Sequence, residues 1–99
     1  MSKSLVIDKM DTILVLAKDR HAYEMWLYEH IPADDIAIKS ILSGAVLTKK
    51  DINIRWIMNE ERVRGYVVEK TRVVLAHGWE ELPYNVVKIA LDRYACLEA

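Results

Sequence analysis

The stretch "TILVLAKDRHAYEMWLYEHIP", residues 12–32, decides the fold class of this chain. Its first six residues form a continuous apolar run, and such a run is typical of a strand that is covered on both faces in a parallel sheet. The following residues predict a helix from about Arg20 to His30, with Asp19 as its N-cap. Pro32 limits that helix, because the residue before a proline avoids the helical conformation. A buried strand followed directly by a helix indicates an α/β domain.

The same pattern recurs near the end of the chain. The run "TRVVLA", residues 71–76, is a second strand of the doubly covered type, and "HGW" predicts a turn in which Gly78 supplies a positive φ. The segment "ELPYNVVKIALDRYACLEA" predicts the clearest helix, with Pro83 in its first turn. Cys96 lies within this helical pattern, so we expect it to be packed in the interior.

The middle of the chain is less clearly patterned. Residues 33–48, "ADDIAIKSILSGAVLT", fit either a strand or a short helix that is capped by Asp34 or Asp35 and ends before Gly44. The next segment, "DINIRWIM" at 51–58, alternates apolar and polar residues and predicts a half-buried strand. We expect "VRGYVV", residues 63–68, to return after the polar turn "NEER" as the second arm of a β-hairpin.

The order of these elements predicts one domain over residues 1–99. Strands alternate with helices, which indicates a small Rossmann-like α/β domain with a partly parallel sheet, flanking helices and a β-hairpin. The connection that follows the first strand is long enough for a right-handed crossover.

Composition narrows the classes of partner. Lysine and arginine number 14, aspartate and glutamate 15, and the formal net charge is -1. Nucleic-acid binders show a basic excess or stripe, so this balance disfavours nucleic acid and anionic membrane as partners. No run approaches the ~20 apolar residues of a membrane helix. Charged residues at Asp8, Lys9 and Asp11 interrupt the N-terminal apolar runs, which excludes a signal-peptide core, and we expect a cytoplasmic protein. One cysteine cannot form an internal disulfide or a four-cysteine zinc site.

Polar side chains follow both predicted buried strands. Ligands of open α/β sheets collect beyond the carboxyl ends of the strands, and helix N-termini favour anions. If the two strands are parallel neighbours, their ends form one rim that suits an anionic small ligand. The candidate ligand-binding residues at this rim are Lys18, Asp19, Arg20, His21, His77, Gly78 and Trp79.

Most of these candidates also have a purely structural explanation. Asp19 suits a helix cap, and Lys18 and Arg20 suit solvated charges. His21 suits a surface position on the first helical turn, and His77 suits a hydrogen-bonded corner.

No catalytic motif is present in the sequence. It holds no G-x-S-x-G, no H-E-x-x-H, no G-x-x-x-x-G-K-[ST] and no G-x-G-x-x-G. His21, His30 and His77 do not have the spacing of metal ligands. We therefore expect no catalytic residues, no metal and no cofactor.

Two segments, "TILVLAKDRHAYEMWLYEH" and "NIRWIMNEERVRGYVVEKTRVVLAHGWEELPYNVV", resemble parts of a P-loop ATPase core of the helicase and terminase kind. The resemblance implies that the first is the strand and helix after the phosphate loop, and that the second reaches the acidic Walker B strand. This chain lacks the phosphate loop, and Ala76-His77 stands where that family carries Asp-Glu. The resemblance therefore implies a related or degenerate fold without ATP hydrolysis.

These observations favour a non-enzymatic binding or assembly protein. Three tryptophans, five tyrosines and four methionines are of the types enriched in protein interfaces, and Trp79 could be an exposed contact anchor. We expect a protein partner or a second copy, as in a homodimer, and a small accessory protein or inhibitor of the kind that phages encode fits this size. The alternative is a domain that binds a nucleotide or another anionic metabolite at the rim. An enzyme with His77 as general base is the weakest hypothesis, because the sequence shows no orienting partner.

Overall fold

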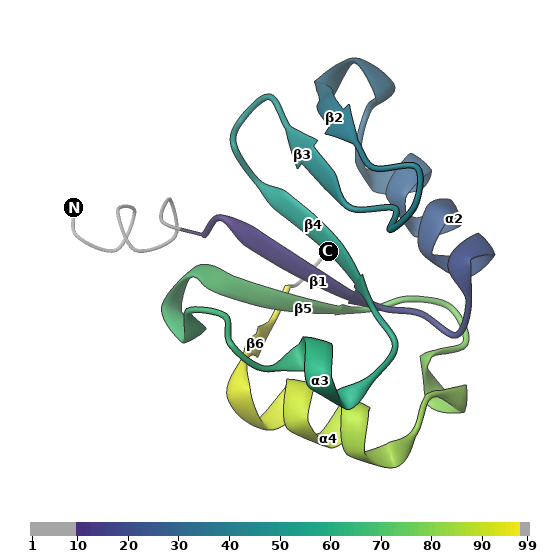
Figure 1. Ribbon diagram of the computed structural model, residues 1–99, viewed down its shortest axis with the longest axis vertical. Coiled ribbons are helices and arrows are strands. Elements are labelled where there is room, and N and C mark those ends of the chain that lie inside the picture. The colour runs from purple at the N-terminus through teal and green to yellow at the C-terminus, as the bar shows by residue number, and fades with distance from the viewer. Residues whose placement is uncertain (1–9, 98–99) are drawn as a thin grey trace.

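The computed structural model describes residues 10–97, and within them the chain forms one mixed sheet with helices on both faces (Figure 1). The sheet order is β2-β3-β4-β1-β5-β6. The strands are β1 (Thr12–Leu16), β2 (Ile36–Lys39), β3 (Val46–Thr48), β4 (Asn53–Ile57), β5 (Thr71–Leu75) and β6 (Ala95–Cys96). The helices are α2 (Arg20–His30), α3 (Glu60–Val63) and α4 (Tyr84–Arg93), with short 3-10 turns at Ala33–Asp35, Val68–Lys70 and Trp79–Glu81.

Strand β1 lies at the centre of the parallel part of the sheet. It pairs in parallel with β4 on one side, where Thr12 is opposite Asn53, and with β5 on the other, where Leu16 is opposite Leu75. All five of its residues are buried. The predictions of a doubly covered parallel strand and of an α/β fold are therefore confirmed.

Each face of the sheet carries its own apolar core. On one face, α2 contributes Ala22, Tyr23 and Leu27 to a cluster with Ile13 and Val15. On the other face, α3 and α4 pack against a cluster whose members are Leu14, Leu16, Ile57, Val63, Val73, Leu82, Val86, Ala90 and Tyr94. Alternate residues of β1 point to opposite faces, so one short strand fills both cores.

The predicted ends of the helices agree closely with the structure. Helix α2 spans the expected residues, and its Asp19 cap accepts a hydrogen bond from the Ala22 N–H at 2.8 Å. Pro83 lies directly before α4, at the N-cap position rather than in the first turn. Residues 33–48 contain a 3-10 turn, β2 and β3, which decides between the two open alternatives in favour of strand.

Two predictions about the middle and the end of the chain are wrong. Antiparallel hairpins connect β2 to β3 and β3 to β4, while residues 63–68 form the end of α3, an irregular segment and the start of a 3-10 turn, with no strand. Cys96 is exposed on β6 instead of packed in a helix. The helical pattern ends early because Tyr94 already has extended backbone angles, φ -124° and ψ 149°.

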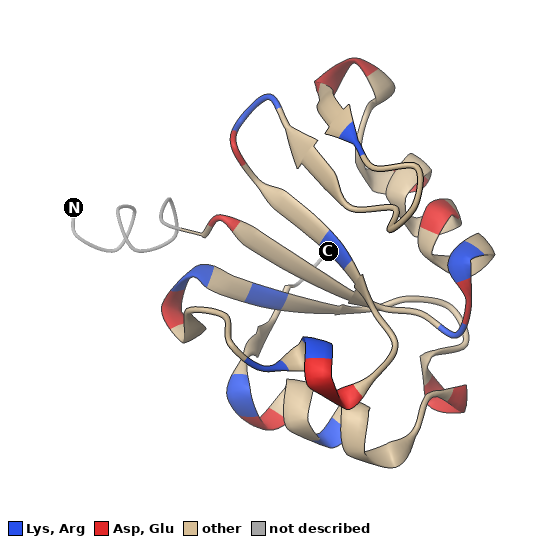
Figure 2. Ribbon diagram, in the orientation of Figure 1, with Lys and Arg blue, Asp and Glu red and all other residues tan. Residues whose placement is uncertain are grey.

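Charge is spread over the surface in both signs (Figure 2). Basic and acidic positions occur on helices, strands and turns throughout the molecule, in keeping with the net charge of -1. Within residues 10–97, no helix has the length and apolar character that crossing a bilayer requires.

Candidate functional site

The carboxyl ends of β1 and β5 lie side by side, which meets the condition that the sequence left open for a shared rim. The Ala76 N–H donates to the Leu16 carbonyl at 2.9 Å, which joins the two strand ends. The chain leaves β1 through α2 on one face of the sheet and leaves β5 through α4 on the other. Adjacent strands whose connections diverge in this way mark the point where open α/β sheets bind ligands.

The side chain of Lys18 covers that point. Gly78 has a φ of 82°, as predicted, and a Cβ placed there would lie 2.5 Å from the Lys18 Cδ. Lys18 also forms an ion pair with Glu81, with 3.5 Å between Nζ and Oε2. A ligand at this rim would have to displace Lys18 from Gly78.

The other rim candidates diverge from this point. Asp19 is occupied as the α2 cap, and His21 and His77 are exposed, with no side-chain hydrogen bond or ion pair to the described residues. Trp79 is half-buried and lines a cavity of about 530 Å³ that runs along α4. Arg20 turns away toward β2. The structure thus brings Lys18 and Gly78 together, and it does not gather the seven candidates into one site.

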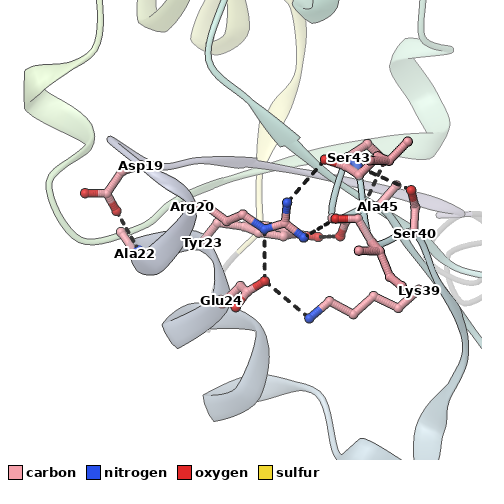
Figure 3. Close-up of polar contacts among 12 residues, drawn as sticks. Asp19, Arg20, Ala22, Tyr23, Glu24, Lys39, Ser40, Ser43 and Ala45 are labelled. Carbon is pink, nitrogen blue, oxygen red and sulfur yellow. Dashed lines mark hydrogen bonds and ion pairs between the residues drawn. The ribbon is translucent and has the colours of Figure 1, made fainter.

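Arg20 holds a loop that the sequence did not single out (Figure 3). Strand β2 runs parallel to β4, because each is antiparallel to β3, so the 40–45 loop after β2 lies at the same edge as the end of β1. The Arg20 guanidinium donates to the Ile41 carbonyl at 2.7 Å and to the Leu42 carbonyl at 3.2 Å. Both carbonyls of the loop tip are therefore fixed by one planar, bidentate donor.

Further hydrogen bonds complete the fixation of the 40–45 loop. The buried Tyr23 hydroxyl donates to the Gly44 carbonyl. The Gly44 N–H donates to the Ser40 carbonyl and the Ser40 N–H to the Ala45 carbonyl, each at 2.8 Å. The loop backbone consequently has little freedom although its tip is exposed.

A charged cluster supports Arg20 from the side. Glu24 accepts from the Arg20 Nε at 3.1 Å and from the Lys39 Nζ at 3.3 Å. The hydrogen bond from Arg20 is the main reason that the pKa of Glu24 lies below its ordinary value, and Lys39 adds to it. Lys39 also donates to the Tyr28 hydroxyl at 2.7 Å, which is the main cause of its raised pKa. These groups stay charged near neutral pH and keep Arg20 directed at the loop.

The tip of the loop presents apolar side chains to solvent. Ile41 is 83% exposed and Leu42 is 93% exposed. Leu42 also borders a cavity of about 310 Å³ that Trp56 and Met58 line from the end of β4. Trp56 is fixed there by its indole N–H, which donates to the Ala17 carbonyl at 3.1 Å, and by stacking on Tyr23 with 6.0 Å between ring centroids. A protruding apolar pair thus stands beside an apolar recess.

Comparison with protein-family models, with curated proteins and with solved structures finds no match to this chain. The resemblance to a degenerate P-loop ATPase therefore stays a prediction from the sequence. The function of this protein must therefore be inferred from the geometry of its own structure. In the part of the chain that the structure describes, no three histidine, cysteine, aspartate or glutamate side chains gather in a way that could hold a metal ion.

Sequence reasoning missed the loop because it treated residues 33–48 as containing a single strand or a single short helix. Ser40, Ser43 and Gly44 are turn-forming residues, and they were the available signal for a loop. Ser43 accepts from the Ala45 N–H and Ser40 from the Ser43 N–H, both at 3.2 Å, which is the local bonding that favours turns over strands. Nothing in the sequence indicated that Arg20 would reach this loop.

Proposed function

We propose that this protein acts by binding protein rather than by catalysis, that its contact surface is the tip of the 40–45 loop with the adjoining recess, and that its partner is a second copy of the chain. The observation that carries the proposal is the rigid presentation of Ile41 and Leu42 to solvent. Two adjacent, almost fully exposed apolar side chains on a fixed backbone are typical of an interaction site.

Rigidity favours binding because the cost of ordering the loop is met when the chain folds. A flexible loop would lose conformational entropy on association, whereas a loop already held by Arg20 and Tyr23 loses little. Burial of Ile41 and Leu42 against a partner removes apolar surface from water and supplies the driving force.

A second copy fits this surface because it is self-complementary. The Leu42 side chain protrudes next to a recess lined by Trp56 and Met58, so two copies related by a twofold axis can each place a leucine in the other's recess. The net charge of -1 gives little long-range repulsion between copies. An accessory or inhibitor role of the kind that phages encode stays an expectation from the sequence.

Light scattering over a dilution series tests the proposal. We expect the wild type to dimerise and Leu42→Asp to be a monomer at the same concentration, because a carboxylate cannot enter an apolar recess without a large desolvation cost. Tyr84→Asp is the matched control, since Tyr84 is 74% exposed on α4 and lies outside this surface. A wild type that stays monomeric at millimolar concentration, or a Tyr84→Asp variant that loses the dimer as Leu42→Asp does, would contradict the proposal.

A further inference from the structure

Two adjoining cavities lie where β4 ends and α3 begins. The larger, of about 310 Å³, and the smaller, of about 40 Å³, share the residues Ser43, Trp56 and Arg62. Arg55 and Tyr66 line the smaller one, and Asn59 lines the larger. We call this region the arginine cleft and define it by Ser43, Arg55, Trp56, Asn59, Arg62 and Tyr66.

Both arginines of the cleft lack a partner among the described residues. Among residues 10–97, the side chains of Arg55 and Arg62 make no hydrogen bond or ion pair, whereas Arg20, Arg64 and Arg72 each do. Of the two acidic residues of α3, Glu60 accepts from Arg64 at 3.4 Å, and Glu61 forms no ion pair with a described residue. Figure 2 shows a basic position on β4 and another on α3, where it lies beside the acidic residues of that helix. Two unpaired guanidinium groups on one small cavity repel each other, and a bound anion would relieve that repulsion.

The other polar groups of the cleft can donate hydrogen bonds. The Asn59 side-chain oxygen already accepts from the Arg62 N–H at 3.1 Å, which leaves the amide NH₂ free to donate. The Ser43 hydroxyl accepts from the Ala45 N–H, so its proton is also free. The Tyr66 ring is held edge-on against Tyr94, with 6.5 Å between centroids, and no described group uses its hydroxyl. A set made of donors matches an oxyanion, which only accepts.

The larger cavity adds an apolar wall to this set of donors. Trp56 uses its indole N–H on the Ala17 carbonyl, so it offers only ring surface to a ligand. Met58 and Leu42 continue that apolar lining. The volume of about 310 Å³ lies at the lower end of the range for small-molecule sites.

We propose that the arginine cleft binds a small organic phosphomonoester, with the phosphate between Arg55 and Arg62 and the organic part against Trp56 and Met58. The dianion matches two guanidinium groups in charge and in bidentate geometry. This site differs from the rim between β1 and β5. It includes the recess proposed above for Leu42 of a second copy, so the ligand and the second copy compete for that recess. The proposal rests on the donors that have no partner among the described residues, and not on exposed apolar surface.

Isothermal titration with adenosine monophosphate, inorganic phosphate and adenosine as probes tests the proposal. We expect adenosine monophosphate to bind saturably and inorganic phosphate to bind more weakly. Adenosine should bind at least about tenfold more weakly than adenosine monophosphate, since the loss of a charged hydrogen bond lowers affinity by about tenfold or more. Arg55→Ala and Arg62→Ala should each weaken adenosine monophosphate binding about tenfold, and each lysine variant should restore part of it.

Arg64→Ala is the control, because Arg64 is exposed, paired with Glu60 and outside the cleft. It should bind as the wild type does. The proposal is overturned if neither phosphate compound binds at millimolar concentration, or if adenosine binds as tightly as its monophosphate. It is also overturned if Arg55→Ala and Arg62→Ala bind adenosine monophosphate with the same affinity as Arg64→Ala. Circular dichroism spectra of each variant check that it is folded, which we expect because the substituted positions are exposed.

Discussion

At the scale of single residues, Tyr23 connects the core to the exposed loop. Its ring is buried and stacks on Trp56, and its hydroxyl holds the Gly44 carbonyl. The same side chain therefore supports both the recess and the loop tip. Neither contact can be inferred from position, because Gly44 and Trp56 are distant from Tyr23 in sequence.

Removing the Tyr23 hydroxyl should destabilise the fold. Tyr23→Phe leaves the buried Gly44 carbonyl without its donor, and we expect a loss of about 1–2 kcal/mol in the free energy of unfolding. Urea denaturation measures it. Tyr84→Phe is the matched control, since Tyr84 is exposed and its hydroxyl makes no hydrogen bond to a described residue, so this variant should lose less than about 0.5 kcal/mol. Equal losses in the two variants would show that the buried hydrogen bond has no special role.

The ionisation of Tyr23 should appear only in strong alkali. Burial raises the pKa of Tyr23 from 10.0 to about 12, so the folded protein holds this proton where the unfolded chain has released it. The resulting stability is complete below pH 10 and is lost as pH rises from 10 toward 12. Tyrosinate absorbance should show one tyrosine that titrates last and is missing in Tyr23→Phe. If the pH dependence of stability above pH 10 is the same in both proteins, the pKa of Tyr23 is not raised by folding.

The exposure of Cys96 gives a test of the corrected C-terminus. Cys96→Ser should change the free energy of unfolding by less than about 0.5 kcal/mol, because an exposed side chain buries little apolar area. If Cys96 were buried in a helix, as the sequence pattern favours, Cys96→Ser would lower the free energy of unfolding by more, because a polar hydroxyl would then be buried. Chemical denaturation distinguishes the two cases, and a loss well above 1 kcal/mol would support burial.

At the scale of elements, strands and helices with strong local signals could be predicted and the others could not. The two continuous apolar runs predicted β1 and β5, and Asp19 as N-cap together with Pro32 predicted where α2 begins and ends. The β3–β4 hairpin was not predicted because its arms are connected by residues 49–52. In that connection Asp51 takes a φ of 65°, a conformation that glycine usually supplies. Without Asn-Gly or Asp-Gly, the sequence offered no turn signal there.

The candidate site was less predictable than the fold for a physical reason. Strand ends can be located from local patterns, so the rim of β1 and β5 was placed correctly. The direction of a long side chain depends on its tertiary neighbours. Arg20 donates to two carbonyls of the 40–45 loop, and the position of that loop can be predicted only if the pairings β2–β3, β3–β4 and β4–β1 are known. Arg62 gave no sequence signal beyond its polar surroundings.

Loosening the loop should be possible without unfolding the domain. Arg20→Ala removes both donors from the Ile41 and Leu42 carbonyls, and we expect the Gly44 and Ala45 amides to exchange hydrogen at least about tenfold faster. Amide exchange followed by nuclear magnetic resonance measures this. Arg64→Ala removes the guanidinium of a more exposed arginine from an unrelated ion pair and should leave those amides unchanged. Unaltered exchange in Arg20→Ala would mean that the loop is held without Arg20.

At the scale of the whole molecule, the two cores share β1 and should unfold together. Trp26 and Trp56 pack with the core on the α2 face, and Trp79 packs with the core on the α4 face. In a double variant, Trp26→Phe with Trp56→Phe, the fluorescence reports the core on the α4 face, and in Trp79→Phe it reports the core on the α2 face. We expect each fluorescence signal to change at the same denaturation midpoint as the circular dichroism of that variant. A tryptophan signal that changes apart from the circular dichroism would indicate that one layer unfolds before the other.

The central position of β1 has a consequence for the order in which the chain is made. Thr12 pairs with Asn53 and with Thr71, so β1 leaves the ribosome before either of its two sheet partners and waits for them while much of the chain follows. At 5–20 residues per second, the wait for β5 is roughly 3 to 12 s. During that time a strand without a single charged residue is open to chaperones and to aggregation. Pairings so distant in sequence also slow the search for the native sheet, which makes translation speed and holding chaperones important for the yield of this protein.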